Sequence, residues 1–183
     1  ARRGEAFRLQ AAVDTVADLA RSVAPAPVVL AGDSLGGYTA LASAAALPRQ
    51  QLSGLVLAGS TANMVGSALR SLLIRQMLVL GLGGLLGEAS LAALLAKDLR
   101  KWGVAEEDIR AQIDAGFNHR VFPQAVQALR GIDFRPRLAA VEQPVLIMNP
   151  DDDLGAVTRA TAHLFRNGIL FDLPGVKHGV LSI

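Results

Sequence analysis

Apolar residues recur along the chain in two patterns, one typical of helices and one of buried strands. A first helix is predicted by five apolar residues at spacings of four, three, four and three: Leu9, Val13, Val16, Ala20 and Val23. Continuous apolar runs predict four strands, each buried on both faces, at residues 28–31, 52–59, 144–149 and 169–173. Helical patterns at residues 36–47 and 155–166 alternate with these runs. The alternation predicts an α/β fold with a parallel sheet and right-handed crossovers.

The connection between the second and third predicted strands does not follow this alternation. It is too long for a single crossover and contains helical patterns at residues 63–80, 88–102, 105–115 and 123–129. We therefore predict an α/β core formed by residues 1–60 and 138–183, with residues 61–137 inserted as a helical cap over the strand ends. Seven apolar residues of the cap would form a lid or pocket wall, although packing inside the cap and against the core is favoured for most: Leu72, Leu73, Met77, Leu78, Leu82, Leu85 and Leu86.

Composition narrows the choice of partners and location. Hydrophobic residues make up 51% of the 183 residues and aromatic residues only 4%, so the core must consist of Leu, Val, Ile and Ala. The lack of cysteine excludes disulfides, thiolate metal sites and cysteine nucleophiles, and it is compatible with the cytoplasm, which we predict as the location. A net charge of +2 gives no reason to expect a nucleic-acid partner. The most apolar stretch, residues 77–87, is too short and too rich in glycine to predict a membrane span.

One short segment carries the strongest chemical signal. Residues 32–36 read Gly-Asp-Ser-Leu-Gly, directly between a predicted strand and a predicted helix. A serine on so abrupt a turn is forced into a strained backbone conformation that exposes its hydroxyl above the sheet. Gly32 and Gly36 are expected where strand and helix pass too closely for a side chain. The alternative is an ordinary turn with a capping serine; the flanking strand and helix favour a nucleophile at Ser34.

A serine nucleophile needs a base to remove its proton, and three histidines are available. His178 follows the fourth predicted strand, which places it at the same sheet edge as Ser34, where ligands bind in parallel sheets. His163 lies in a predicted helix and is expected to be a surface or packing residue. His119 belongs to the predicted cap, where an ordinary helix-end position is favoured over contact with a substrate. His178 is therefore the predicted base.

The base in turn needs an acid that orients it. Residues 149–153 read Asn-Pro-Asp-Asp-Asp and directly follow the third predicted strand, at the required edge. Three adjacent carboxylates repel one another, and one of them is expected to cap the next helix. One carboxylate turned toward the imidazole is sufficient. From the residues alone, Asp151, Asp152 and Asp153 all remain open.

The order serine, aspartate, histidine, each directly after a strand, resembles the α/β-hydrolase fold superfamily, and the resemblance covers nearly the whole chain. It implies that Ser34 attacks an acyl carbonyl, that His178 takes and returns the proton, and that the Leu35 N–H donates to the oxyanion. In that family the acid usually stands three residues beyond a glycine that ends the strand. Pro150 occupies this place, which indicates Asp153. The family needs neither a metal nor an organic cofactor, so none is expected.

Two residues depart from the family pattern. Pro150 replaces the usual glycine, which keeps Asp151 and Asp152 open as the acid. Asp33 precedes the serine, where these enzymes often have histidine, and adds a negative charge near the nucleophile. The sequence assigns this charge no role.

The resemblance implies a serine hydrolase that cleaves an ester, lactone or related acyl bond of a small apolar substrate. An acyltransferase or a carbon–carbon bond hydrolase with the same triad remains an alternative, as does a binding protein that keeps the fold without turnover. The family also has strands before the one that leads into the serine turn, and a helix after the histidine. A loop after one of those earlier strands carries a second oxyanion donor. We expect the chain to be a fragment without these parts, whose residues 28–31 form an exposed apolar sheet edge able to self-associate.

Overall fold

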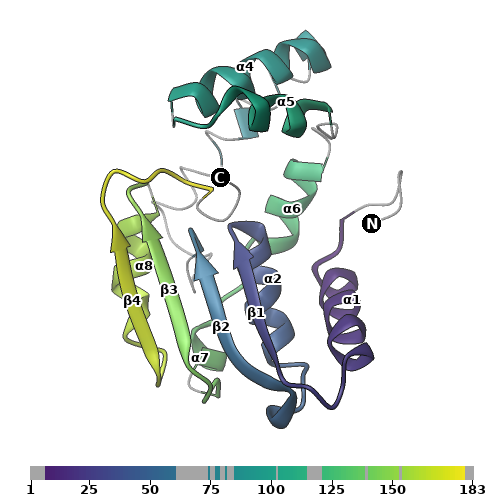
Figure 1. Ribbon diagram of the computed structural model, residues 1–183, viewed down its shortest axis with the longest axis vertical. Helices are drawn as coiled ribbons and strands as arrows, with labels where there is room; N and C mark the ends of the chain where they lie inside the picture. Colours follow the sequence, from purple (N-terminus) through teal and green to yellow (C-terminus); the bar gives the residue numbers. More distant parts are fainter. Residues whose placement is uncertain are drawn as a thin grey trace.

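The computed structural model describes residues 7–60, 74, 77–78, 81, 85–101, 103–114, 121–138, 140–152 and 154–179. Its strands form one parallel sheet in the order β1-β2-β3-β4 (Figure 1), with the bounds β1 Val28–Asp33, β2 Leu52–Ala58, β3 Val145–Pro150 and β4 Gly168–Leu173. The described helices are α1 Leu9–Ser22, α2 Leu35–Ala44, the 3₁₀ turn η1 Arg49–Gln51, α4 Glu88–Lys101, α5 Glu106–Asp114, α6 Val121–Leu129, α7 Arg135–Leu138 and α8 Gly155–Ala162. The predicted α/β fold with a parallel sheet is confirmed.

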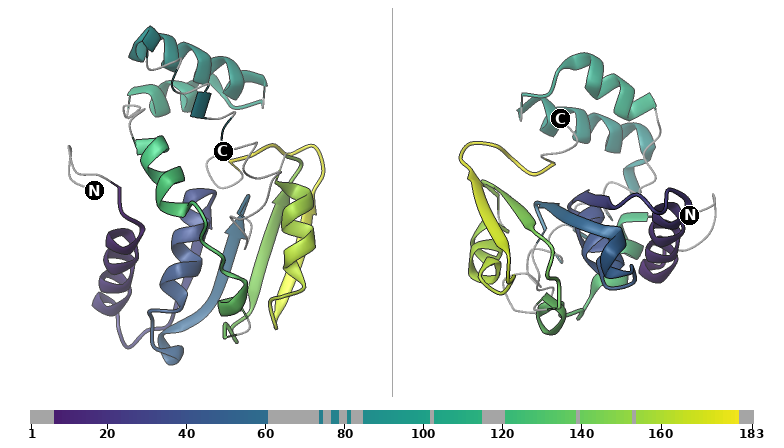
Figure 2. Two further views of the ribbon diagram at one scale, coloured as in Figure 1. Left: turned by 180° about the vertical axis from the view of Figure 1, so that it is seen from behind. Right: turned by 60° about the horizontal axis from the view of Figure 1, so that its bottom comes forward.

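One face of the sheet carries the main core. Helices α2 and α8 lie against this face, and α1 packs on the outer side of α2 (Figures 1 and 2). Alternate strand residues point into the layer between sheet and helices, where burial of aliphatic side chains supplies most of the stabilisation. The most buried strand residues of this layer are Leu55, Leu57, Val145 and Ile147.

The opposite face of the sheet is open to solvent. Val29, Ile169 and Phe171 are 58%, 65% and 56% exposed, and Leu146 is 36% exposed. Leu146 pairs with Ile169, so these side chains belong to a single face. The prediction of strands buried on both faces is wrong for this face because the described helices that pack against the sheet lie on the other one. β1 forms an edge of the described sheet, as predicted.

Helices α4 and α5 lie beyond the carboxyl ends of the strands (Figure 1). They pack on each other around a small cluster of their own, formed by Ala96, Leu99, Val104 and Ile109. None of the described helices combines the length and the apolar character that a membrane crossing requires.

The apolar residues that were expected to pack inside the insertion do not all do so. Leu78, Leu85 and Leu86 are 62%, 84% and 72% exposed, and Met77 is 38% exposed, so the packing interpretation is wrong for them. Leu72, Leu73 and Leu82 lie outside the described residues. These exposed apolar side chains are available to contact another molecule.

Candidate active site

Ser34 lies on the turn that joins β1 directly to α2. Its backbone has φ 52° and ψ −116°, the one positive φ of a non-glycine residue in the described part of the chain. Its N–H donates to the Ala58 carbonyl (2.9 Å), which extends the β1–β2 pairing, and its carbonyl accepts from the Gly37 N–H (3.0 Å). The predicted strained turn is confirmed, and these two bonds hold Ser34 in a conformation that an isolated chain would avoid.

At this turn the strand and the helix approach each other too closely for side chains at some positions. A Cβ atom on Gly32 would lie 2.2 Å from the Gly36 carbonyl oxygen and 2.6 Å from the Gly37 nitrogen. A Cβ atom on Gly37 would lie 1.8 Å from Ser60 Oγ and 2.8 Å from Ser60 Cβ. A Cβ atom on Gly36 would meet nothing within 4 Å. The prediction that Gly36 is required by close packing is therefore wrong, because its hydrogens face solvent and Gly37 makes the close approach.

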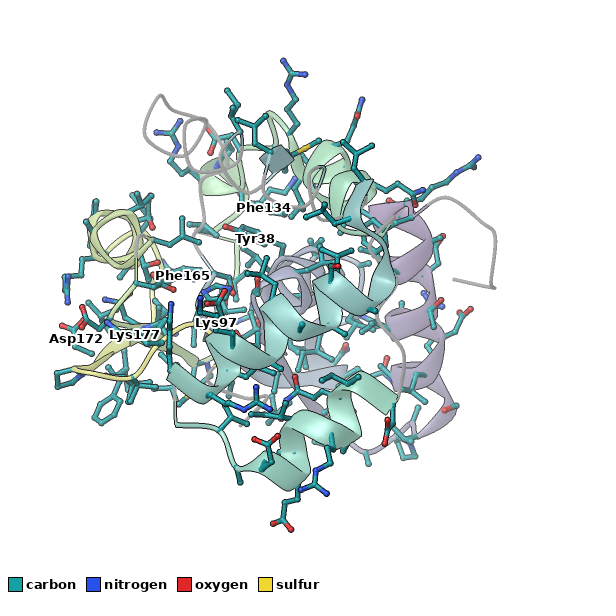
Figure 3. All side chains as sticks on the ribbon, turned by 90° about the horizontal axis from the view of Figure 1, so that it is seen from above. Tyr38, Lys97, Phe134, Phe165, Asp172 and Lys177 are labelled. Atoms are coloured by element: carbon teal, nitrogen blue, oxygen red, sulfur yellow. The ribbon has the colours of Figure 1, made fainter. Side chains whose placement is uncertain are left out.

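Helix α2 is held rigidly behind the serine. Tyr38 is 4% exposed and stacks on Phe134, with the ring centroids 6.0 Å apart (Figure 3). Leu35 is the first residue of α2, so its N–H has no partner four residues earlier within the helix. This N–H and the positive end of the helix dipole are therefore available to an oxyanion beside Ser34.

The loops that follow β3 and β4 start at the same level of the sheet, since Pro150 pairs with Leu173. The Asp151 N–H donates to the Val176 carbonyl (2.8 Å). The Lys177 ammonium donates to the Asp151 carbonyl (3.0 Å) and to its carboxylate (3.1 Å), on the β4 side of the sheet (Figure 3). These bonds fasten the acidic loop to the histidine loop.

These bonds between the two loops bring His178 into contact with Asp152. His178 Nδ1–H donates to Asp152 Oδ2 at 2.6 Å, and the side chains are 32% and 12% exposed. The other carboxylate oxygen, Asp152 Oδ1, accepts from the Leu154 N–H (2.8 Å), which fixes the carboxylate at the start of α8. Asp153, the residue indicated by the family pattern, lies outside the described residues. Asp152 was one of the alternatives left open.

The pKa of His178 is raised above its ordinary value of 6.5. The hydrogen bond that the imidazole donates to Asp152 is the largest cause; burial opposes it, and the negative charges of Asp152 and Asp33 add to it. Since Nδ1 carries the proton donated to Asp152, Nε2 is the nitrogen left to accept a proton. This is the arrangement that a general base requires.

Not all predicted members of the site are in contact in the described part of the chain. No hydrogen bond connects Ser34 Oγ to His178 in the described part of the chain. His163 directly follows α8 and is exposed, in agreement with the expected surface or packing position, and His119 lies outside the described residues. Around Ser34, Asp152 and His178, the described residues include no group of three His, Asp or Glu side chains suited to a metal ion.

Sequence reasoning missed one residue at the centre of this edge. Gly59 follows β2 with φ +54°, and a Cβ atom there would lie 3.0 Å from His178 Cε1 and 3.1 Å from His178 Nδ1. The imidazole therefore occupies the space that a side chain at this position would fill. A glycine directly after a buried apolar strand was the signal that could have indicated this close approach.

A parallel sheet with a strained serine between β1 and α2, and with an acid and a histidine after its last two strands, defines the α/β-hydrolase fold. Solved structures of this fold match almost the whole chain. An E-2-(acetamidomethylene)succinate hydrolase has 22% identity and a TM-score of 0.73, over 97% of this chain and 69% of its own. An esterase from Exiguobacterium antarcticum has 16% identity and a TM-score of 0.73, over the same shares.

An enol-lactonase from Burkholderia xenovorans has 19% identity and a TM-score of 0.68, over 92% of this chain and 65% of its own. The chain thus spans about two thirds of the length of these structures. Its sequence matches no family model and no curated protein. The chain has the α/β-hydrolase fold.

Two glycine variants test the close approach at the turn. We expect Gly37→Ala to lower the free energy of unfolding by about 1–3 kcal/mol, because the new methyl group overlaps Ser60. The matched variant Gly36→Ala should leave stability unchanged or raise it by about 0.4–1 kcal/mol, because space is open there and the unfolded chain loses freedom. Urea unfolding measures both. Equal destabilisation by the two variants would contradict this geometry.

The raised pKa of His178 makes a pH-dependent contribution to stability. A folded-state pKa above the unfolded value means that this contribution is complete below pH 6.5 and is lost as the pH rises through the folded pKa. We therefore expect the stability difference between wild type and His178→Gln to be larger at about pH 5.5 than at about pH 8.5 in urea unfolding. Asp152→Asn should remove most of this pH dependence. A difference that does not change with pH would show that the imidazole has no such partner.

Proposed function

We propose that the protein is a serine hydrolase that cleaves an ester, lactone or related acyl bond of a small apolar substrate. Ser34 is the nucleophile, His178 the general base and Asp152 the acid that orients it. The observation that carries this proposal is the 2.6 Å hydrogen bond between His178 and Asp152, at the sheet edge where Ser34 sits on its strained turn. A strained serine, an oriented imidazole and a largely buried acid together match the requirements of acyl transfer.

The proposed reaction has two halves. Ser34 Oγ attacks the acyl carbon while His178 Nε2 takes the hydroxyl proton, and the tetrahedral intermediate collapses when His178 returns this proton to the leaving alcohol. Water then attacks the acyl-serine, His178 takes its proton, and the carboxylic acid leaves as Ser34 recovers its hydrogen. Rotation of the Ser34 hydroxyl or closure of the His178 loop on substrate would complete the hydrogen bond between them, since such bonds often tighten only in the complex.

The Leu35 N–H supports the charge that develops on the acyl oxygen. It stands at the amino end of α2, beside the serine, where the helix dipole also favours negative charge. One such donor contributes about 10²–10³ in rate.

The substrate preference is proposed from the exposed apolar residues of the segment between β2 and α4. The exposed side chains of Leu78, Leu85 and Leu86 favour an apolar acyl or alcohol group. Helices α4 and α5, which have their own apolar cluster, support the predicted cap of residues 61–137 as a separate unit over the core. The enol-lactonase and the esterase among the similar structures are in keeping with this substrate class. The cytoplasmic location remains a prediction based on the cysteine-free sequence.

Paired aspartate variants identify the acid. With p-nitrophenyl butyrate as substrate, we expect Asp152→Asn to lower kcat by about 10⁴-fold, because the amide no longer stabilises the imidazolium or selects its tautomer. Asp153→Asn should retain activity within about tenfold, since it removes a carboxylate of the same loop without touching the 2.6 Å bond. The reverse ranking would assign the acid to Asp153, and full activity in Ser34→Ala would overturn the proposed function.

We also propose that the protein self-associates through β1, whose outer backbone groups have no strand beside them in the described sheet. Val29 on this strand is 58% exposed, and a second copy offers an identical edge that can pair with it about a two-fold axis.

Light scattering tests this pairing. We expect the mass of the wild type to rise with concentration, and Val29→Lys to reduce the rise because a charged edge strand resists pairing. The control Leu19→Lys changes a residue that is 68% exposed on α1, and it should associate like the wild type. A wild type that stays monomeric at every concentration would contradict the proposal.

A further inference from the structure

We infer that the Asp33 carboxylate is a second anionic partner of the His178 imidazole, which acts through space beside the hydrogen-bonded Asp152. In this role Asp33 is a positioning residue that sets the proton affinity of the base. The inference rests on the proposed function for its catalytic meaning, although the pairing itself can be measured independently of turnover.

The geometry around Gly59 brings the two groups together. The point where a Cβ atom of Gly59 would lie is 3.3 Å from Asp33 Oδ1 and 3.0 Å from His178 Cε1. The carboxylate and the ring therefore lie within about twice that distance of each other, beside a residue with no side chain. Because Gly59 has no side chain, both Asp33 and His178 can approach this point.

The sheet holds Asp33 at this level. Asp33 is the last residue of β1 and pairs with Ala58, the last residue of β2, so it stands next to Gly59. Its Oδ1 atom is buried from solvent. Asp33 as a whole is half-buried, and a carboxylate that is partly removed from water acts more strongly on a neighbouring ionisable group than a surface charge at the same distance.

The electrostatic environment of His178 supports its pairing with Asp33. The raised pKa of His178 has its largest cause in the hydrogen bond with Asp152, and the negative charge of Asp33 contributes in the same direction. Asp152 acts on the ring from the loop after β3, and Asp33 acts on it from β1. The Lys177 ammonium, next in sequence to His178, binds the Asp151 carboxylate. The negative charge of Asp151 therefore offsets the positive charge of Lys177 near the ring.

The chemical consequence follows from the two states of the base. When His178 takes the serine proton, the imidazolium gains from two carboxylates rather than one, which favours the transition state. The same two charges keep the ring protonated to higher pH in the free protein, where it cannot act as a base. Asp33 therefore increases rate on the pH plateau and shifts the acid limb of the pH profile upward.

Proton NMR titration of labelled histidine tests this inference. The signals of His178 are identified among those of the three histidines by their loss in His178→Gln. We expect Asp33→Asn to lower the pKa of His178, and we expect the acid limb of kcat/KM for p-nitrophenyl butyrate to move to lower pH while the plateau rate falls. Asp33→Glu, which keeps the charge, should restore both values toward the wild type. Asp18→Asn makes the same change in net charge on α1, where Asp18 pairs with Arg21, and should leave both unchanged.

An unchanged pKa of His178 in folded Asp33→Asn would overturn the inference, as would an equal shift in Asp18→Asn. The wild type supplies a check that needs no variant: a nuclear Overhauser effect between His178 Hε1 and the Gly59 Hα protons is expected, and its absence also overturns the inference. Failure of the proposed function is distinguishable, because Ser34→Ala would then keep full activity while the titration of His178 still responded to Asp33.

Discussion

The close approach of β1 and α2 is the constraint on which the remaining site depends. Gly32 and Gly37 leave no room for side chains between strand, helix and Ser60, so the chain must reverse direction within one residue. Ser34 takes that position at a positive φ, which costs on the order of 1–3 kcal/mol and is held by the bonds from β2 and from α2. The same turn presents the serine hydroxyl and the first N–H of α2 side by side.

The parallel register of the strands then determines which loops lie at the same sheet edge as the serine. Each strand ends at the same edge, so the loops after β3 and β4 meet there. Two of the adjacent carboxylates, which both remained open as the acid from the residues alone, have different partners: Asp151 binds Lys177, and Asp152 binds His178. In each pair the two partners lie 26 residues apart in sequence. A single alignment of the two loops therefore makes both contacts at once.

Local signals predicted the parts of the site that are themselves local. The turn at Ser34 could be read from Gly32 and the abrupt change from strand to helix, and His178 from its place after an apolar run. The contact with Asp152 depends on how two distant loops pair, which spacing alone does not specify. The roles of Gly37 and Gly59 depend on Ser60 and His178, which approach them only in the folded chain. The open face of the sheet was missed for a related reason: an apolar run predicts a strand but does not identify what covers it.

Covalent labelling of Ser34 by a fluorophosphonate, located by peptide mass spectrometry, tests the central claim most directly. The account predicts a single label on Ser34 of the folded protein, no label in Ser34→Ala, and much slower labelling in His178→Ala because the base is gone. A folded wild type that takes up no label, or takes it up equally fast without His178, would contradict the account.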